Sequence, residues 1–444
     1  MAGGTFLSIH EKKRAGTYIN FKSSGTRGRS TATRGITVVP LNDYDWGPEK
    51  TFIEVDASSP DKNYTLLGRS IYDNNSHMLL IREALKNTST VLVYNVGGTG
   101  GAKATVKAGA LTATAKFNGT KGNSLKIAVT ANTNESFDVS VYLDTSLVVE
   151  YKDKTKAEDL ANVNNDYIVF TGTGDLTAVA GSALTGGKNN TSSNINITDF
   201  LDACEMRNWN TMAFPFSDSS LQAALLTKIK YMRETMGKKV QAAAPNFKAD
   251  YEGIINVTNS VKLEDADLTT EQATAFVAGI SAGASKLVSN TYKTYTGAIG
   301  VVGEKTHEQA VTAIDNGEFF FSMSEAGEVI VEYDINSFVS FTEDKNEDFR
   351  KNKIIRILDT LATELSAEFK PNRFTNDETG WSAMESLGRS IIKTYVEDGS
   401  LTNPDYDNDF LVDRSVSVGD MVVFNVGVQP VDAAEKLFFN ITTR

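Results

Sequence analysis

Apolar residues follow two spacings along the chain, and the two alternate. ITVVPL (36–41) and TVLVYNV (90–96) are continuous apolar, β-branched runs, as expected for strands buried on both faces. Between them, SHMLLIREALKN (76–87) repeats apolar residues at helical spacing, with Ser76 in the position of the N-cap. These residues are therefore predicted to contribute strand, helix and strand to an α/β sheet.

The same alternation resumes after about residue 196. Strands are predicted in TMAFPF (211–216), KKVQAAAP (238–245) and GIINVTNSV (253–261), and helices from near Asp218 and over TTEQATAFVAGISAGAS (269–285). Alternating strands and helices predict a mostly parallel sheet with right-handed crossovers. The strands before residue 97 are expected to complete this sheet, so the α/β domain is predicted to be discontinuous.

The intervening residues have a different character, rich in Gly, Thr, Asn and Ala. Short runs alternate polar and apolar side chains, as in LTATAKF, LKIAVTA, FDVSVYL and DYIVFTG, and only KAEDLANV is expected to be helical. This pattern predicts an all-β insert of sandwich or barrel type. Its glycine-rich flanks, VGGTGGAK and TGGKNNTSSN, are interpreted as hinges of a module placed in a surface loop.

The remaining segments predict an α+β unit and two strand-bearing arms. Helices are expected over 349–369 and 381–397, followed by strand-like runs in MVVFNVGV and KLFFNITTR. Near the N-terminus, TYINF (17–21) alternates like a strand, but the Gly/Ser/Thr/Arg-rich segment 23–35 separates it from any core. Such a strand either frays or pairs with the edge of another sheet, which favours strand exchange between subunits.

The predicted fold class is α/β and α+β multidomain, with a discontinuous α/β core, an inserted all-β domain, a C-terminal α+β domain and extended terminal strands. The expected divisions are an arm and linker (1–34), the core (35–96 plus 197–345), the insert (97–196) and the C-terminal domain (346–444).

Charge and composition narrow the function. The 444-residue chain carries a net charge of −12, which argues against general nucleic-acid binding. Residues 1–39 hold seven Lys/Arg against one Glu, whereas residues 315–348 hold ten Asp/Glu against one Lys. These segments suit attraction between subunits, or else a solubilising tail and a solvated acidic face. The sequence has no apolar run of about 18 residues and no signal-peptide pattern, so we expect no membrane insertion and synthesis in the cytoplasm.

Residue types that usually carry catalysis are sparse. His10, His77 and His307 have no second His or Cys at ligand spacing, and Cys204 is expected to be a buried small apolar residue. A metal site or catalytic triad would require tertiary proximity that the sequence does not indicate.

Three apparent motifs are incomplete. VGGTGGAKAT places Lys103 between alanines, where a phosphate-binding loop needs Gly before Lys and Ser/Thr after it. GTGDLT lacks the third glycine of a dinucleotide fingerprint. NPDYDNDFLVD has aspartates at three calcium-loop positions, but Phe410 replaces the glycine and Val416 the closing glutamate. We therefore predict no catalytic, cofactor-binding or metal-binding residues, and no cofactor.

Six stretches of the chain are informative when taken together. In chain order they are AGTYINF (15–21), RGITVVPLNDYDWGPEKTFIEV (34–55), REALKNTSTVLVY (82–94), AKFNGTKGNSLKI (115–127), ATAFVAGISAGAS (273–285) and VQPVDAAEKLFFNITTR (428–444). The most specific are the surroundings of Trp46-Gly47-Pro48, the AGISAGA helix (278–284) and the carboxyl end. Together the six resemble the phage tail sheath family, in the branch of phages and phage-tail-like R-type bacteriocins of Gram-positive bacteria.

This resemblance implies a structural subunit of a contractile sheath, not an enzyme. Such a subunit polymerises helically around a tail tube, contracts to drive the tube through a target envelope, and contacts the tube, baseplate and tail terminator proteins. The particle, a virion tail or a phage-tail-like particle, is assembled in the bacterial host cytoplasm. The C-terminal domain is expected to face the tube, and the insert to lie outside.

The resemblance also implies that each terminal arm adds a strand to a neighbour's C-terminal domain. The inter-subunit strand residues are then Thr17, Tyr18, Ile19, Asn20, Phe21, Leu437, Phe438, Phe439, Asn440, Ile441 and Thr442. Lys12, Lys13 and Arg14 are candidate electrostatic contacts of the N-terminal arm.

Two other functions stay open at this point. An α/β core with a β insert also suits a nucleotide-dependent enzyme, which nucleotide-induced thermal stabilisation would reveal. A second alternative is a self-assembling surface-layer type protein, which the missing signal peptide disfavours.

Overall fold

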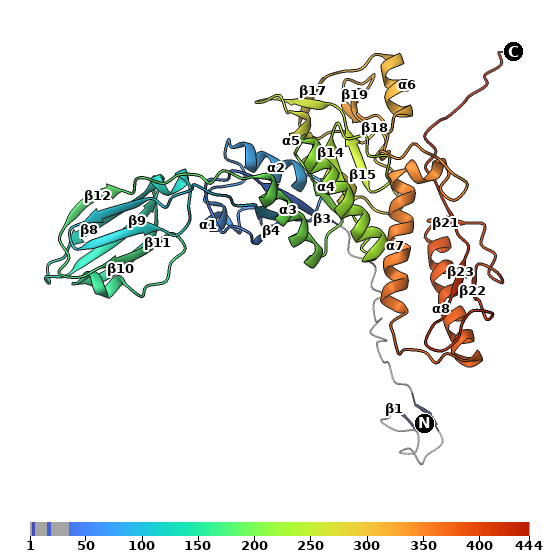
Figure 1. Cartoon of the computed structure of the whole chain (residues 1–444), viewed down its shortest axis with the longest axis horizontal. Coiled ribbons are helices and arrows are strands. Elements are labelled where there is room, and N and C mark those ends of the chain that lie inside the picture. The colour runs from blue at the N-terminus through green and yellow to red at the C-terminus, as the bar shows by residue number, and fades with distance from the viewer. Residues whose placement is uncertain (1, 5–15, 19–34, 444) are drawn as a thin grey trace.

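The computed structural model describes residues 2–4, 16–18 and 35–443. The molecule is elongated, with a β-rich insert at one end, an α/β core in the middle and a helical hairpin at the other end (Figure 1). The carboxyl-terminal segment projects away from the body beyond this hairpin (Figure 1). None of the helices in the described part of the chain is long and apolar enough to cross a membrane.

A seven-stranded sheet forms the centre of the core, in the order β18-β15-β14-β13-β3-β5-β4. Neighbouring strands are parallel except β4, which runs antiparallel to β5. Its strands are β3 (Ile36–Leu41), β4 (Phe52–Asp56), β5 (Thr90–Asn95), β13 (Thr211–Ala213), β14 (Gln241–Pro245), β15 (Ile254–Val257) and β18 (Glu318–Phe319). Strands from both sides of the insert share this sheet, which confirms the predicted discontinuous, mostly parallel core.

Helices cover both faces of the sheet because its strands are apolar on both sides. Val39 and Val93 pack with the helices α2 (Ser76–Leu85) and α5 (Thr270–Gly283). Their neighbours Val38 and Leu92 point to the other face, where α3 (Asn194–Ala203) and α4 (Ser219–Lys230) lie. The core is therefore a three-layer α/β/α arrangement.

Details of the core differ from the sequence-based expectation. The N-cap of α2 is Asn75, not Ser76, because Asn75 Oδ1 accepts hydrogen bonds from the backbone N–H groups of His77 (3.0 Å) and Met78 (3.3 Å). The run GIINVTNSV forms two strands, β15 and β16, because the chain turns at Thr258 and Asn259 into a separate hairpin. The predicted run covers only the first two residues of β16 (Ser260–Leu263). Elements that the periodicity did not indicate include β4, α1 (Tyr64–Leu67), α6 (His307–Asp315), β17 (Ala298–Val302), β19 (Phe321–Met323) and β20 (Val329–Val331).

The insert is a β-sandwich, as predicted. A four-stranded antiparallel sheet β10-β9-β8-β12 packs with a three-stranded sheet β11-β7-β6. The predicted helical stretch KAEDLANV is only a 3-10 turn at Ala157–Leu160. The strands are β6 (Thr105–Ala108), β7 (Leu111–Ala115), β8 (Leu125–Ala131), β9 (Phe137–Leu143), β10 (Ser146–Lys154), β11 (Ile168–Gly172) and β12 (Val179–Ala183).

The two flanks of the insert lie side by side and form a neck, not two separate hinges. Antiparallel bridges join Thr99 to Thr191, Ala102 to Lys188 and Thr105 to Thr185. A Cβ atom on Gly98 would lie 2.3 Å from the carbonyl oxygen of Thr191, so glycine here permits close approach of the two segments.

The C-terminal unit is built on two long helices, α7 (Asn352–Glu368) and α8 (Glu378–Glu397), close to the predicted ranges. Ile357, Leu361, Ile391 and Tyr395 form its apolar core with Phe410. Two small antiparallel sheets accompany the helices, β21-β24 and β22-β23. Their strands are β21 (Leu401–Thr402), β22 (Phe410–Val412), β23 (Phe424–Val426) and β24 (Gln429–Pro430).

The two predicted C-terminal strands are largely absent from the single chain. MVVFNVGV contains only the short β23, and KLFFNITTR forms no strand over its described residues. A strand needs a hydrogen-bonding partner, and this segment projects away from every sheet of its own chain (Figure 1).

Candidate functional site

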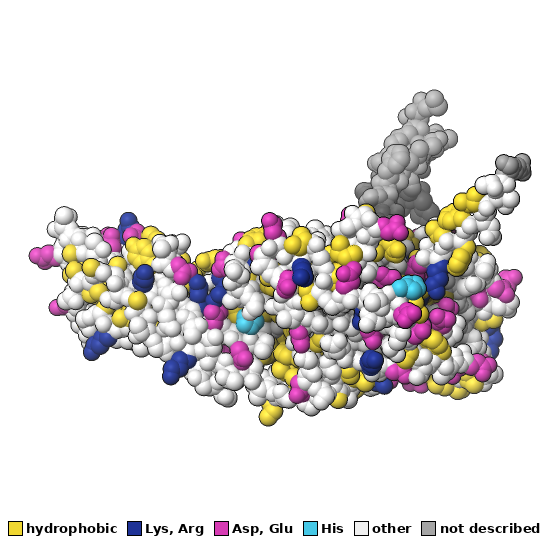
Figure 2. Space-filling model, turned by 90° about the horizontal axis from the view of Figure 1, so that it is seen from above, with side chains coloured by type: hydrophobic (Ala, Val, Ile, Leu, Met, Phe, Trp, Pro, Cys, Tyr) yellow, Lys and Arg dark blue, Asp and Glu magenta, His cyan; other side chains and the backbone are white. Residues whose placement is uncertain are grey.

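The projecting C-terminal tail, residues 431–443, carries large apolar side chains that are exposed in the described part of the chain (Figure 2). The exposed fractions are 67% for Leu437, 87% for Phe438, 80% for Phe439 and 88% for Ile441. Exposing four such side chains within five residues costs free energy that burial against a partner would recover. The tail therefore has the composition of a strand whose apolar side chains would be buried by pairing with another molecule.

Little of the predicted N-terminal arm falls within the described residues. Thr17 and Tyr18 belong to β2 (Gly16–Tyr18), which pairs in parallel with β1 (Ala2–Gly4). The other predicted arm residues, Ile19, Asn20 and Phe21, lie outside the described residues, as do Lys12, Lys13 and Arg14.

The C-terminal unit offers places where an added strand can bind. Each of its two small sheets has only two strands, with Phe410–Val412 paired to Phe424–Val426 and Leu401–Thr402 paired to Gln429–Pro430. Each two-stranded sheet has an edge on both sides, although Glu385 already accepts the N–H of Val412 in β22 (2.9 Å), and an isolated pair of strands is marginally stable. A third and fourth strand from other molecules would stabilise these sheets.

The most buried charged contact at the root of the tail is made by Glu435. Its carboxylate accepts a hydrogen bond from Ser289 Oγ at 2.7 Å and is ion-paired with Lys351, the N-cap residue of α7. Lys351 also pairs with Asp432 (3.4 Å) and lies over the ring of Tyr333, 4.3 Å from its centroid. The Glu435 side chain is only 8% exposed, in contrast to the apolar residues that follow it.

The charges of this contact reinforce one another. Burial would raise the pKa of Glu435, but hydrogen bonds from Lys351, Thr291 and Ser289 outweigh burial and lower it. Burial would also lower the pKa of Lys351, yet the hydrogen bonds that its ammonium group donates to Glu435 and Tyr333, and the nearby carboxylates, raise it. Both groups are therefore charged at neutral pH.

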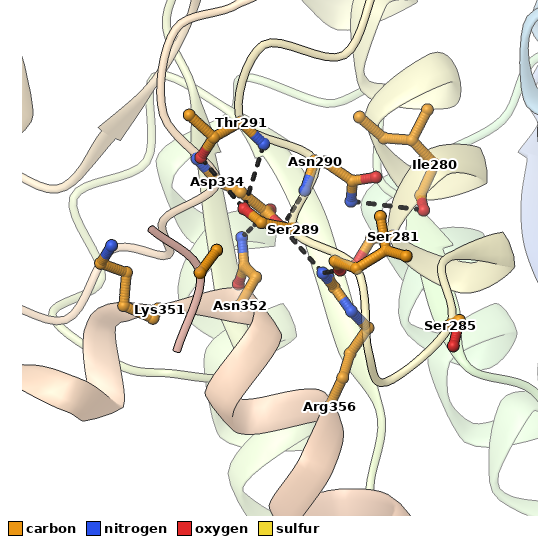
Figure 3. A network of polar contacts seen from close by, with 12 residues as sticks. Ile280, Ser281, Ser285, Ser289, Asn290, Thr291, Asp334, Lys351, Asn352 and Arg356 are labelled. Carbon is orange, nitrogen blue, oxygen red and sulfur yellow. Dashed lines mark hydrogen bonds and ion pairs between the residues drawn. The ribbon is translucent and has the colours of Figure 1, made fainter. Parts of the chain in front are cut away.

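A buried polar network lies beside Ser289 and Lys351, the two partners of Glu435 (Figure 3). Asp334 is its centre and accepts hydrogen bonds from the backbone N–H of Asn290 (2.9 Å), Asn352 Nδ2 (2.9 Å) and the guanidinium of Arg356 (2.8 Å). The side chains of Asp334 and Arg356 are 2% and 0% exposed. Asp334 donates its own N–H to Thr291 Oγ1 (3.0 Å), which connects the network to the tail root.

A second buried pair joins α7 to the core. Arg233, in the turn after α4, donates to both carboxylate oxygens of Asp359, at 2.8 and 2.9 Å. Sequence periodicity predicted only the apolar stripe of α7, so these polar residues were missed. In the structure, residues 352–357 have no exposed face, because α7 is buried on the side facing the core as well as against α8.

Two of the stretches singled out in the sequence analysis, the Trp46 segment and AGISAGA, have clear packing roles. Trp46 is 1% exposed, donates its indole N–H to the carbonyl of Thr65 (2.9 Å) and meets Phe117 of the insert edge to face, with ring centroids 5.3 Å apart. The Trp46 loop therefore docks the insert on the core. In AGISAGA, a Cβ on Gly283 would lie 1.7 Å from the carbonyl oxygen of Asn87, so glycine lets α5 approach the end of α2.

Within residues 35–443, the histidines and the cysteine lie on separate elements. Among the described residues, no group of three or more His, Cys, Asp or Glu side chains is arranged to hold a metal. Cys204 is buried, and burial raises the pKa of its thiol. His77 packs edge to face on Tyr44, and burial lowers its pKa. His10 lies outside the described residues, and His307 begins α6.

The acidic stretch 315–348 is not one uniform face. Asp334 is buried in the network described above, and Glu318 lies between Lys248 (3.7 Å) and Lys305 (3.4 Å). Residues such as Glu343 and Asp344 are exposed. Only part of the predicted acidic charge is therefore available to a partner.

Comparison with family models covers nearly the whole chain in four consecutive matches. They are a tail sheath protein Gp18 domain III N-terminal region (residues 34–96), a phage tail sheath protein beta-sandwich domain (99–190), a phage tail sheath protein central domain (190–337) and a phage tail sheath C-terminal domain (344–444).

Full-length relatives give the same result. The chain is 38% identical to the phage-like element PBSX protein XkdK of Bacillus subtilis over 99% of both chains. Its structure is similar to the sheath tail protein of Desulfitobacterium hafniense, with a TM-score of 0.84 and 35% identity over 96% of this chain and 99% of that one. It is also similar to the sheath tail protein Lin1278 of Listeria innocua, with a TM-score of 0.78 and 34% identity over 91% and 94%.

Proposed function

The chain belongs to the phage tail sheath family and is a subunit of a contractile tail sheath, and we propose that its two terminal arms join neighbouring subunits by strand exchange. The observation that carries this proposal is the C-terminal tail, whose residues from Leu437 to Ile441 expose large apolar side chains without forming a strand in their own chain. The open edges of the two-stranded sheets are the receiving sites.

The proposed donor residues of the C-terminal arm are Leu437, Phe438, Phe439, Asn440, Ile441 and Thr442, and those of the N-terminal arm are Thr17, Tyr18, Ile19, Asn20 and Phe21. Main-chain hydrogen bonds contribute about 0.5–1.5 kcal/mol each in net terms, and each strand supplies several. Such links keep neighbours connected while other contacts between subunits change during contraction.

The sheath location in a virion tail or tail-like particle follows from the family. We propose further that the assembled sheath surrounds a tail tube, with the C-terminal domain facing the tube and the insert outside, and that baseplate and tail terminator proteins bind its two ends. Assembly in the host cytoplasm, and the division of the chain at residues 34, 96, 196 and 345, belong to the same proposal.

The family is structural and is not an enzyme family. We propose that this chain has no catalytic activity, in keeping with the scattered positions of Cys204, His77 and His307. The nucleotide-dependent enzyme considered at first is not favoured by any of the matches. Nor are the surface-layer proteins.

Negative-stain electron microscopy of purified protein tests strand exchange. Full-length chain is compared with variants lacking residues 1–22 or 437–444, each with and without added tube and baseplate to nucleate assembly. We expect striated hollow cylinders from the full-length chain, and only separate particles from either truncated variant with an unchanged melting temperature. Normal cylinders from both truncated variants would contradict strand exchange.

A further inference from the structure

The C-terminal tail changes character abruptly at Glu435. The last backbone hydrogen bond that ties this segment to the rest of the chain, among the described residues, runs from the N–H of Val431 to the carbonyl of Ser400 (2.9 Å). Lys436 is exposed, and every following described residue is exposed. Glu435 alone in this stretch turns a charged side chain inward, where it is 8% exposed.

Burying a carboxylate is unfavourable unless it is paired and hydrogen-bonded. Glu435 satisfies this condition with partners from two distant segments, Ser289 in the loop after α5 and Lys351 at the start of α7. Asp432 adds a second contact to Lys351, so the tail root is held across four residues. A tail surrounded only by solvent would not bury a charged side chain in this way.

Hydrogen bonds connect the Glu435 contact to the buried polar network around Asp334. Ser289 Oγ accepts a hydrogen bond from the N–H of Thr291 (3.2 Å), and Thr291 Oγ1 accepts from the N–H of Asp334 (3.0 Å). Asp334 is in turn paired with Arg356 of α7 (Figure 3). Glu435 is therefore connected to the buried junction between core and C-terminal unit, and not only to the marginal sheet β21-β24.

We propose that Glu435 is the anchor of the C-terminal arm: with Lys351 and Ser289 it fixes where the arm leaves the subunit and carries the pull of the neighbouring subunit into the core. The inference rests on the proposed strand exchange. It adds a positioning residue that lies outside the exchanged strand itself.

Anchoring matters for two physical reasons. A strand whose root is fixed samples fewer directions, so less conformational entropy is lost when it pairs with a neighbour. During contraction, a pull on the arm acts first at its root, and a charge-assisted contact to the buried network resists it better than the two residue pairs of β21-β24.

The anchor is tested first in the free subunit. Spin labels at position 438 (Phe438→Cys) and position 393 (Lys393→Cys), in a Cys204→Ala background, report the distance between the arm and α8 by double electron–electron resonance. Glu435→Ala is expected to broaden the distance distribution, because the detached arm samples more directions. Lys436→Ala is the matched control, since Lys436 is the exposed neighbour, and should leave the distribution unchanged.

Assembly is tested in parallel with the unlabelled full chain. Loss of a hydrogen-bonded charge is expected to raise the critical concentration for cylinder formation by about tenfold or more. Glu435→Gln keeps the size of the side chain and one hydrogen-bonding oxygen but removes the charge, so it should recover only part of the assembly; full recovery would show that the charge does not contribute. If Glu435→Ala proves unstable to heat, Ser289→Ala removes one hydrogen bond of the anchor and takes its place.

The outcomes separate the two proposals. An unchanged distance distribution and critical concentration in Glu435→Ala would overturn the anchor, even if removal of residues 437–444 abolishes cylinders. Normal cylinders without residues 437–444 would overturn C-terminal strand exchange, while the distance measurement still decides whether Glu435 holds the arm.

Discussion

Arg233 and Asp359 form a two-point ion pair between the core and the first helix of the C-terminal unit, with N–O distances of 2.8 and 2.9 Å. Their side chains are 6% and 9% exposed. A third guanidinium hydrogen bond, to the carbonyl of Val240 at 2.9 Å, ties the pair to the residue just before β14. Together with Asp334 and Arg356, this pair makes the junction a polar, interlocked surface.

Breaking this pair on one side is expected to be costly. Arg233→Met leaves Asp359 buried without its partner and should lower the free energy of unfolding by about 3–5 kcal/mol, measured by urea denaturation. The double variant Arg233→Met/Asp359→Leu removes both charges and should be more stable than either single variant. Lys50→Ala breaks the exposed pair with Asp199 and serves as control, with an effect of about 0–1 kcal/mol.

Gly283 is predicted to tolerate no side chain. Gly283→Ala would force a Cβ against the carbonyl oxygen of Asn87, a backbone atom that cannot rotate away, so α5 must shift. We expect a loss of about 1–3 kcal/mol in unfolding free energy, seen as a lower melting temperature. Gly300→Ala is the matched control, because its Cβ would meet only Lys262 at 3.6 Å. Equal melting temperatures for both variants would refute the close approach.

The two faces of the C-terminal arm should contribute unequally. In an added strand, Phe439 and Ile441 point to one side and Phe438 to the other. Replacing Phe439 and Ile441 with serine should lower cylinder yield more than Phe438→Ser, since burial of such a side chain contributes about 1.5–3 kcal/mol. All three are exposed in the free chain, so the melting temperature of the subunit should not change. A fall in that temperature would indicate that the arm already packs in the monomer.

The positive charges of the N-terminal arm should act mainly at low salt. Changing Lys12, Lys13 and Arg14 to glutamine is expected to slow cylinder formation at low ionic strength and to have little effect at high salt, where charges are screened. The rate of cylinder formation is measured by turbidity at a series of salt concentrations. A triple variant of exposed lysines on the insert, Lys107, Lys126 and Lys188 to glutamine, controls for net charge. Assembly that is unchanged in low salt would reject the arm as an electrostatic contact.

The anchor at Glu435 should hold over a wide pH range. The pKa of Glu435 is lowered from its ordinary 4.5, so its stabilising contribution is present above that value and is lost as the pH falls through the lower folded pKa. The pKa of Lys351 is raised from its ordinary 10.5, so its contribution is present below that value and is lost only as the pH rises beyond it. Between these two pKa values both groups stay charged, so the stabilising contribution of the ion pair does not change with pH.

The distance between the labelled arm and α8 should therefore stay unchanged from about pH 5 to about pH 10 and broaden on acidification below that window. Asp432 and Lys353 also face this contact, and burial lowers the pKa of Lys353. Glu435→Gln removes the titrating group and should abolish the acid-induced broadening. A transition near neutral pH would contradict the ion pair as the basis of the anchor.

Much of the fold could be predicted because its helices and strands are strongly periodic. Val38 and Val39 sit in a continuous apolar run, which correctly indicated a sheet covered on both faces. The cap of α2 was misplaced by one residue, since Asn75 and Ser76 are both good caps and only the backbone shows which one is extended.

The candidate site was harder to predict. Exposed apolar residues in the tail were visible as a strand pattern, but Glu435 looked like an ordinary surface charge between Ala434 and Lys436. Its partner Ser289 is 146 residues away, and Arg233 and Asp359 are separated by 126 residues. Pairings of this kind leave no periodic mark, because they depend on how whole domains meet.

The neck below the insert has a consequence for protein engineering. The chain enters the insert at Thr99 and leaves it at Thr191 as partners in one antiparallel bridge, so the two cut points lie roughly 5 Å apart. A foreign module whose own termini lie that close would fit this spacing, provided that it also covers Trp46, against which the insert packs Phe117. A particle assembled from such chimeric subunits would then present one copy of the module per subunit, as a regular array suited to vaccine display or enzyme scaffolding.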